Sequence, residues 1–250
     1  LVFVAFNRVW EPVSPLTLLL SAGFGFLFVA TILLYMKAME TGPLAFSTLL
    51  FSMALAVPIL YGALFLDEPV NLLQAGGLLL LILTFTLARQ TTSLDEKKPS
   101  LRWLFFVVAA CLGNGCLMTL SKAHQATYPG LEVEEFLIIA FTTAAVASLI
   151  LFFMRRNKAG YTVGAVGHLR SKRFTVLVVI AGLTTGLGNL AGLILAGRIP
   201  AIIQFPMTNG GLVIMATILS SILYRERITR RTIAGLVIGL LALVLLSRQG

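Results

Sequence analysis

Long stretches without a charged residue are the feature that most constrains this chain. A bilayer core about 30 Å thick takes about 20 apolar residues of helix, because backbone polar groups in lipid must be hydrogen-bonded within the segment. The sequence has eight such runs, at residues 12–36, 41–66, 69–88, 103–121, 136–154, 174–197, 199–224 and 232–247. Runs such as LLLLILTF lack the alternation of a transmembrane strand. We therefore predict an all-α, polytopic membrane protein that is surrounded by the lipid bilayer.

Composition excludes most other classes of protein. Of the 250 residues, 58% are apolar and 12% are charged, about half the charge of a typical soluble domain. The net charge of +9 does not indicate nucleic-acid binding, because the cations lie in short clusters between the apolar runs. The sequence has no metal-binding HExxH, no phosphate-binding glycine loop and no nucleophile beside a base. We therefore predict that the protein is not an enzyme and has no cofactor, no metal site and no nucleic-acid partner.

The sequence contains an internal repeat at an offset of 158 residues. The stretch FLDEPVNLLQAGGLLLLIL, around Glu68, resembles LYRERITRRTIAGLVIGLLAL, around Glu226, and Gly77 aligns with Gly235. Five predicted helices separate the two glutamates, and an odd number of crossings places them on opposite membrane faces. The repeat is therefore expected to be inverted, which is a recurring plan of secondary transporters.

The repeat divides the chain into residues 1–90, from the first half, and 101–250, the second half. At the same offset, the partner of the segment near Leu101 would begin about 57 positions before residue 1, a stretch that would hold one whole helix and most of another. We therefore predict an inverted repeat of two five-helix bundles (5+5), of which this chain lacks the first helix and most of the second.

Basic residues in the predicted loops indicate orientation, because cationic loops stay cytoplasmic. One side of the membrane carries 15 Lys and Arg residues and the other side carries 4. The larger group comprises Lys37 and the basic residues of the loops 89–102, 155–173 and 225–231. The count predicts that these loops are cytoplasmic and that the carboxyl end is outside.

The five-plus-five plan resembles the drug/metabolite transporter superfamily, specifically its EamA-type domain repeated twice. In that family each repeat ends with a helix, a short corner carrying Glu and a final helix containing Gly, as around Glu68 and Glu226 here. The preceding helix opens near a Pro, as in ETGPLAF and GRIPAIIQFP. The resemblance implies a multi-pass transporter or exporter of small organic metabolites in the cell (inner or plasma) membrane. It also implies that both ends are cytoplasmic, which disagrees with the count of basic residues.

Polar groups inside the spans are costly, so those that face inward are candidates for substrate binding. The richest cluster lies in the run 199–224, where proline removes a helical hydrogen bond and should create a kink with accessible carbonyls. Its binding candidates are Gln204, Thr208 and Asn209, and its hinge candidates are Pro206, Gly210 and Gly211.

The corresponding helix of the other half is also polar and contains prolines. Its binding candidates are Ser47 and Thr48, and its hinge candidates are Pro43 and Pro58. Further binding candidates are Thr185 and Asn189, which share a helix face, and Asn114, which lies between two glycines. The alternative is that these groups bond neighbouring helices and only stabilise their packing.

The remaining ionisable residues lie near the ends of the runs. Glu68 and Glu226 are interpreted as helix caps or hinge anchors in preference to proton carriers, because a carboxylate favours a helix amino terminus. Glu132 is expected to be solvated, and His124 and His168 are expected in loops and not as ligands.

No charged residue lies near the middle of any run. A proton- or sodium-coupled pump commonly uses a carboxylate there, so its absence favours exchange or efflux of a neutral or zwitterionic metabolite, such as an amino acid, a nucleoside or a drug-like molecule. We predict a secondary transporter working by alternating access. The alternative is a non-transporting scaffold or receptor of the same fold, and a homodimer is compatible with either.

Overall fold

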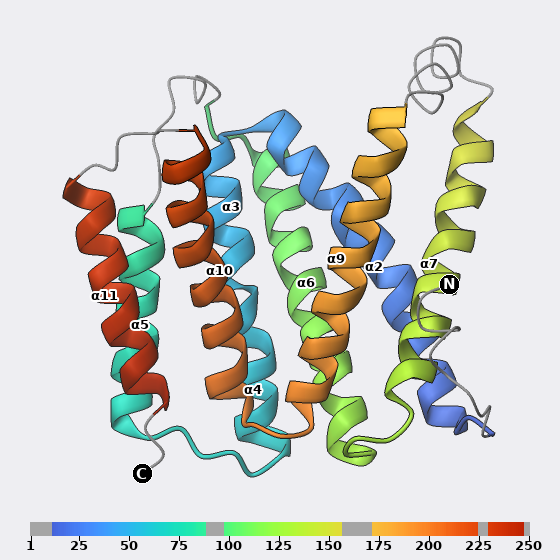
Figure 1. The fold of residues 1–250 in the computed structure, drawn as a ribbon, viewed down its shortest axis with the longest axis horizontal. Helices are drawn as coiled ribbons and strands as arrows, with labels where there is room; N and C mark the ends of the chain where they lie inside the picture. Colours follow the sequence, from blue (N-terminus) through green and yellow to red (C-terminus); the bar gives the residue numbers. More distant parts are fainter. Residues whose placement is uncertain (1–11, 89–97, 157–171, 225–229, 248–250) are drawn as a thin grey trace. The chain divides into compact units, whose positions relative to one another are not determined.

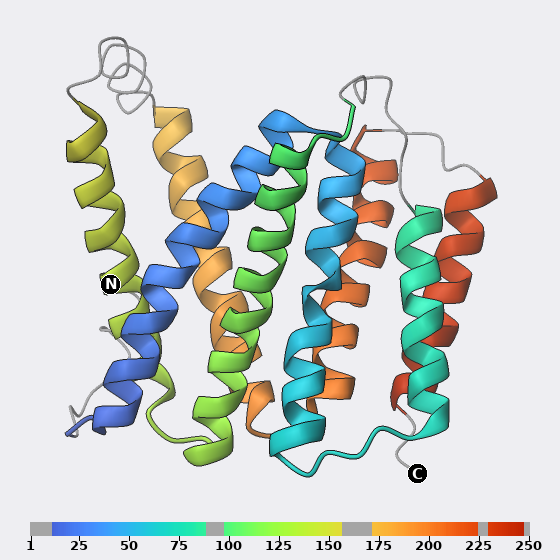
Figure 2. The same cartoon turned by 180° about the vertical axis from the view of Figure 1, so that it is seen from behind.

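The computed structural model describes residues 12–88, 98–156, 172–224 and 230–247, and within these ranges every regular element is helical (Figure 1, Figure 2). Each of the eight predicted runs contains helix, and the run 41–66 is divided by a short 3-10 turn. The elements are α2 (Pro15–Thr41), α3 (Leu44–Ser52), η1 (Met53–Leu55), α4 (Ala56–Phe65), α5 (Leu72–Ala88), α6 (Leu101–Thr127), α7 (Val133–Arg156), α9 (Lys172–Ala196), α10 (Ala201–Tyr224) and α11 (Arg230–Ser247). The all-α prediction is confirmed.

The helices have the length and surface of membrane spans. Within the described ranges, five stretches are long and apolar enough to cross a membrane, namely Pro15–Thr41, Phe46–Phe65, Leu101–Thr127, Val133–Met154 and Phe174–Ala196. Large apolar side chains cover their outer faces; Leu19 is 70% exposed and Leu64 is 73% exposed. Water does not tolerate such continuous apolar surface, whereas lipid tails do. The chain is a multi-pass helical membrane protein.

Polar residues begin several of the helices. Ser14 Oγ accepts a hydrogen bond from Thr17 N at the start of α2, and Ser100 Oγ accepts one from Trp103 N at the start of α6. Asn71 and Gln74 form a reciprocal pair of side chain-to-backbone bonds at the start of α5. These side chains satisfy amide groups that no preceding turn of helix can reach.

The first of two compact units comprises residues 1–29 and 123–197. Here α2 crosses α7 closely, because Gly25 has no side chain: a Cβ at that position would lie 2.3 Å from the Ala140 carbonyl oxygen. Phe24 packs edge-on against Phe136 beside this crossing, with ring centroids 5.6 Å apart. α9 lies beside α7 in the same unit.

The second unit comprises residues 30–122 and 198–250. α5 and α11 lie side by side and run antiparallel, since Gly77 near the start of α5 contacts Leu246 at the end of α11, and Thr84 contacts Gly239 (Figure 1). α4 and α10 are also antiparallel neighbours, with the end of α4 beside Ala201 at the start of α10. A buried cluster joins these helices through Leu55, Ile59, Leu81, Ala201, Ile202, Ile203, Phe205, Ala242 and Leu246.

The two compact units can be compared with the predicted sequence halves, but the predicted orientation depends on loops that lie outside the described residues. Each compact unit draws on both predicted sequence halves, 1–90 and 101–250. The basic loops at 89–97, 157–171 and 225–229 lie outside the described residues, so the orientation in the membrane stays a prediction.

The contact between α5 and α11 can be tested with two adjacent glycines. A Cβ on Gly77 would lie 2.9 Å from the Leu246 side chain and 3.0 Å from the Ala242 carbonyl oxygen, whereas a Cβ on Gly76 would meet no atom within 4 Å. Both alanine substitutions should gain similar helix propensity, about 0.5–1 kcal/mol. We expect Gly77→Ala to be less stable than Gly76→Ala by about 1–3 kcal/mol, the usual cost of overpacking. Thermal unfolding of the purified variants would measure this difference, and equal stabilities would contradict the described contact.

Candidate functional site

The corner between α4 and α5 places a carboxylate inside the second unit. α4 ends at Phe65, and Asp67 then adopts a left-handed backbone with φ of 51°. Glu68 N donates to the Gly62 carbonyl oxygen at 3.2 Å, which folds the corner back onto α4. Pro69 follows, and a proline restricts the preceding residue to extended backbone. The sequence D-E-P therefore ends the helix and turns Glu68 inward.

The Glu68 carboxylate binds two positively polarised groups, one on each oxygen. Its Oε1 lies 2.7 Å from Lys122 Nζ near the end of α6, and its Oε2 accepts a hydrogen bond from Ala201 N, the first residue of α10, at 2.7 Å. Lys122 Nζ also donates to the Ile199 carbonyl oxygen at 2.9 Å. The side chains of Lys122 and Glu68 are only 5% and 17% exposed. The carboxylate thus neutralises a buried lysine and a helix amino terminus together.

This geometry confirms the interpretation of Glu68 as a cap, although the helix that it caps is α10 and not the neighbouring α5. Its repeat counterpart, Glu226, lies outside the described residues. The sequence alone does not identify Lys122 as a partner of Glu68. The signal that could have identified it is an isolated lysine at the end of a long apolar run, opposite an isolated glutamate in a tight corner.

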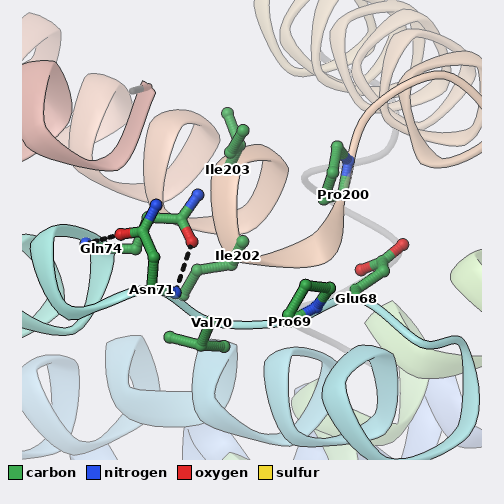
Figure 3. Close-up of a pocket in the computed structure, with 8 residues that line it drawn as sticks. All are labelled: Glu68, Pro69, Val70, Asn71, Gln74, Pro200, Ile202 and Ile203. Carbon is green, nitrogen blue, oxygen red and sulfur yellow. Dashed lines mark hydrogen bonds between the residues drawn. The ribbon is translucent and has the colours of Figure 1, made fainter. Parts of the chain in front are cut away.

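A cavity of about 310 Å³ opens beside this ion pair (Figure 3). Glu68 lies at one end of it, and the reciprocal pair Asn71 and Gln74 lies at the other. Between them the walls are apolar, formed by Pro69, Val70, Pro200, Ile202 and Ile203. A cavity of this volume is at the lower end of the range for small-molecule sites. A carboxylate, two carboxamides and aliphatic walls can accept ammonium or hydroxyl donors on a small amphipathic molecule.

The polar cluster predicted on α10 lies in the same unit. Gln204 is buried and directly follows the cavity residues Ile202 and Ile203 in the sequence. Thr208 Oγ1 donates to the Gln204 and Phe205 carbonyl oxygens, and Asn209 Nδ2 donates to the Phe205 carbonyl oxygen at 2.9 Å. Thr208 is exposed and Asn209 is half-buried. The Thr208 and Asn209 side chains therefore bond their own helix. The hydrogen bonds that the structure describes for them do not reach a neighbouring helix.

The predicted hinge residues have different surroundings. α10 continues as one helix through Pro206, and Gly210 packs under Leu81 and Leu243 while Gly211 has open space beside it. Pro43 is the N-cap residue that precedes α3, and Ser47 N donates to its carbonyl oxygen at 3.0 Å. Pro58 follows the 3-10 turn η1, as expected where a proline removes the bond to the carbonyl of Ala54.

The other predicted binding residues are distributed over both units. Ser47 is fully buried; it donates to the Pro43 carbonyl oxygen and accepts a bond from Trp103 Nε1 at 2.8 Å, so it joins α3 to α6 as a structural contact. Thr48 is exposed on α3, and Asn114 is half-buried on α6. Thr185 and Asn189 lie on α9 in the first unit, where Asn189 Nδ2 donates to the Thr185 carbonyl oxygen at 2.9 Å.

Comparison with known proteins establishes the fold and nothing finer. No known family and no curated protein matches the sequence. Twenty-three chains of solved structures match the structure. One of them, a crystal structure, superposes with a TM-score of 0.76 over 98% of this chain and 82% of its own, at 12% sequence identity. The chain therefore shares its helical fold with a protein of experimentally determined structure.

The buried ion pair predicts a clear difference between two lysines. Lys122→Met would leave the Glu68 carboxylate buried without its cation, and breaking a buried pair costs about 3 kcal/mol or more. Lys37 pairs with Glu40 on the surface, with side chains 49% and 55% exposed, so Lys37→Met should cost about 0–1 kcal/mol. Thermal unfolding of both variants in the same detergent would measure this contrast. A Lys122→Met protein as stable as Lys37→Met would show that Glu68 is not held as described.

Proposed function

We propose that the protein is a secondary transporter of the drug/metabolite transporter type, with two inverted EamA-like halves. It moves a small neutral or zwitterionic organic metabolite across the cell membrane by alternating access. The proposal rests on one observation in the second unit: helices related by the sequence repeat pack against each other in opposite directions.

The helix bounds follow the repeat offset. Shifted by 158 residues, α5 coincides with α11 to within one residue at each end, and the α3–η1–α4 segment coincides with α10 equally well. Both pairs are antiparallel neighbours (Figure 1). An inverted repeat places equivalent helices in opposite directions, and the alternation of the spans gives these pairs the same orientation. The matching bounds and the direct packing of the equivalent helices are the observations that support the repeat.

Individual contacts follow the same symmetry. Leu81 and Ala242 belong to one buried cluster, and their counterparts at the repeat offset are Gly239 and Thr84. Gly239 and Thr84 also lie against each other. A twofold relation between the halves would place both pairs at the same α5–α11 contact, and it would supply the two equivalent arrangements that alternating access needs.

The chemistry near Glu68 supports a substrate without a net negative charge. The cavity presents a carboxylate and two carboxamides, while the buried lysine is already paired with Glu68. An anionic substrate would have to displace that pair, at a cost in a low-dielectric site. A zwitterion or a neutral polar molecule meets compatible groups in the cavity and in the α10 cluster.

Two helices are suited to the required motion. The 3-10 turn at Met53–Leu55 interrupts the α3–α4 segment, and Pro206 removes a backbone bond within α10. A 3-10 stretch within a helix often marks a hinge, and proline weakens the turn that precedes it. These two points lie in neighbouring, repeat-related helices, so bending at both would change the access to the groups between them.

Transport by the protein reconstituted in vesicles tests the proposal. We expect uptake or efflux of at least one member of a panel of amino acids, nucleosides, sugars and amphipathic drugs. Gln204→Ala and Asn209→Ala should each lower the flux about tenfold, as for one lost hydrogen bond in a water-poor site. The amount of each protein in the membrane should stay unchanged.

Thr184→Ala is the control for the loss of a polar side chain from an apolar helix outside the predicted sites. Thr184 is exposed and donates to the Ile180 carbonyl oxygen of its own helix, as Thr208 does to Gln204, but it belongs to no predicted site. Its flux should equal that of the parent protein. Absence of flux for the whole panel would favour the alternative, a non-transporting membrane scaffold or receptor of the same fold.

A further inference from the structure

The first unit contains a fully buried histidine near the end of α6. The expectation of a loop at His124 is wrong, because α6 continues to Thr127. His124 is 0% exposed and lies against Phe136, with ring centroids 4.7 Å apart and the ring planes tilted by 46°. Both ring nitrogens have polar neighbours: Nε2 lies 2.8 Å from Thr17 Oγ1, and Nδ1 lies 3.0 Å from Gln125 Nε2.

Backbone groups determine how the Gln125 carboxamide is oriented. Gly130 N can only donate, and it lies 2.9 Å from Gln125 Oε1. The Leu131 carbonyl oxygen can only accept, and it lies 3.3 Å from Gln125 Nε2. Nε2 must therefore also face His124 as a donor, so Nδ1 accepts and the ring proton is on Nε2. The described state is a neutral His124 that donates to Thr17.

The Nε2 side of the ring leads to a carboxylate. The Thr17 and Ser14 hydroxyls share a hydrogen bond of 2.9 Å, and Ser14 Oγ donates to Glu132 Oε2 at 3.0 Å. Ser14 N also donates to the Glu132 carboxylate, which is half-buried and therefore has protein partners in addition to the expected solvent. Burial disfavours a positive imidazole at His124, and the negative charge of Glu132 at the other end of this short hydrogen-bonded chain offsets part of that cost.

Protonation of His124 would disturb the turn between α6 and α7. An imidazolium donates from both nitrogens, so Nδ1 would then face the amide donor of Gln125. Rotating the carboxamide by half a turn satisfies the ring but brings Nε2 against Gly130 N and Oε1 against the Leu131 carbonyl oxygen. Both bonds to the turn are then lost. This turn already contains left-handed backbone at Gly130 (φ 73°) and Glu132 (φ 50°), which those bonds help to hold.

We propose that His124 is a proton-binding site and that the Gln125 carboxamide transmits its protonation to the α6–α7 turn, residues 128–132. The ligand is a proton taken up at Nδ1, and the response is release of the turn from the end of α6. The proposal concerns the first unit alone and holds whether or not the protein transports a metabolite.

Few other groups near the ring can titrate. From α2 it is faced by the uncharged Thr17, from α7 by Phe136, from its own helix by Tyr128 and Gln125, and from the turn by Glu132 through the hydroxyl chain. Burial raises the pKa of Glu132, but the hydrogen bonds from Thr17 and Ser14 and the charge of His124 outweigh it and leave the pKa below the ordinary 4.5. Glu132 therefore stays ionised above pH about 5, where histidines titrate.

The test uses the full chain in lipid nanodiscs, with a purification tag that contains no histidine. The sequence has two histidines, so His168→Gln leaves His124 as the single imidazole signal for NMR titration between pH about 5 and 8. Hydrogen exchange of peptides covering 128–132 is followed over the same range and corrected for intrinsic rates. Peptides covering 101–110, at the other end of α6, serve as the internal control.

We expect exchange in 128–132 to rise about tenfold on acidification, as for loss of a protecting hydrogen bond, with the midpoint of the His124 ring signal. The parent protein should behave like His168→Gln, and His124→Gln should show no such step. Gln125→Met should exchange rapidly at every pH. The proposal is overturned by a ring that titrates without a change in the turn, by a ring that does not titrate in this range, or by a step that persists in His124→Gln. The first two outcomes are measured in the parent protein and in His168→Gln, where His124 and Gln125 are unchanged. They can therefore overturn the proposal even if His124→Gln fails to fold.

Discussion

A single carboxylate holds together three elements of the second unit. Glu68 comes from the α4–α5 corner, pairs with Lys122 near the end of α6 and accepts the first amide of α10. In a low-dielectric surrounding each of these groups would be costly alone, and together they satisfy one another. Gly62 makes room for this arrangement, since a Cβ there would lie 2.5 Å from Glu68 Oε2. The cavity beside Glu68 and the start of α10 both depend on this contact.

Polar residues within the apolar helices follow a second constraint. Several short side chains of the described helices donate to the carbonyl four residues earlier in their own helix, as Ser52, Thr84, Thr119 and Thr208 do. Such bonds satisfy a hydroxyl in lipid without any partner helix. A polar residue in a span is therefore weak support for a site, and only its exposure to a cavity or to water makes it informative. Ser47, buried between Pro43 and Trp103, shows the structural outcome.

The apolar runs were sufficient to predict the helices, because the length of a span is set by the bilayer and backbone bonding leaves no alternative to helix. Their ends were less predictable. α6 continues past Lys122 and His124 because these polar side chains find buried partners, Glu68 and Thr17, that are distant in sequence. Polar residues are assigned to loops from their neighbours in the sequence, and such an assignment cannot take account of partners that are distant in sequence. The cap formed by Glu68 was predictable from its turn, but the helix that it caps, 133 residues later, was not.

Alternating access between two inverted halves is the central claim, and the reactivity of one residue tests it most directly. The chain has two cysteines, Cys111 and Cys116. With both replaced by alanine, Asn209→Cys places a single thiol in the α10 cluster, and a membrane-impermeant thiol reagent is applied to vesicles from each side in turn. We expect modification from both sides, and we expect a transported solute to slow it. Modification from one side only, or from neither, would contradict alternating access.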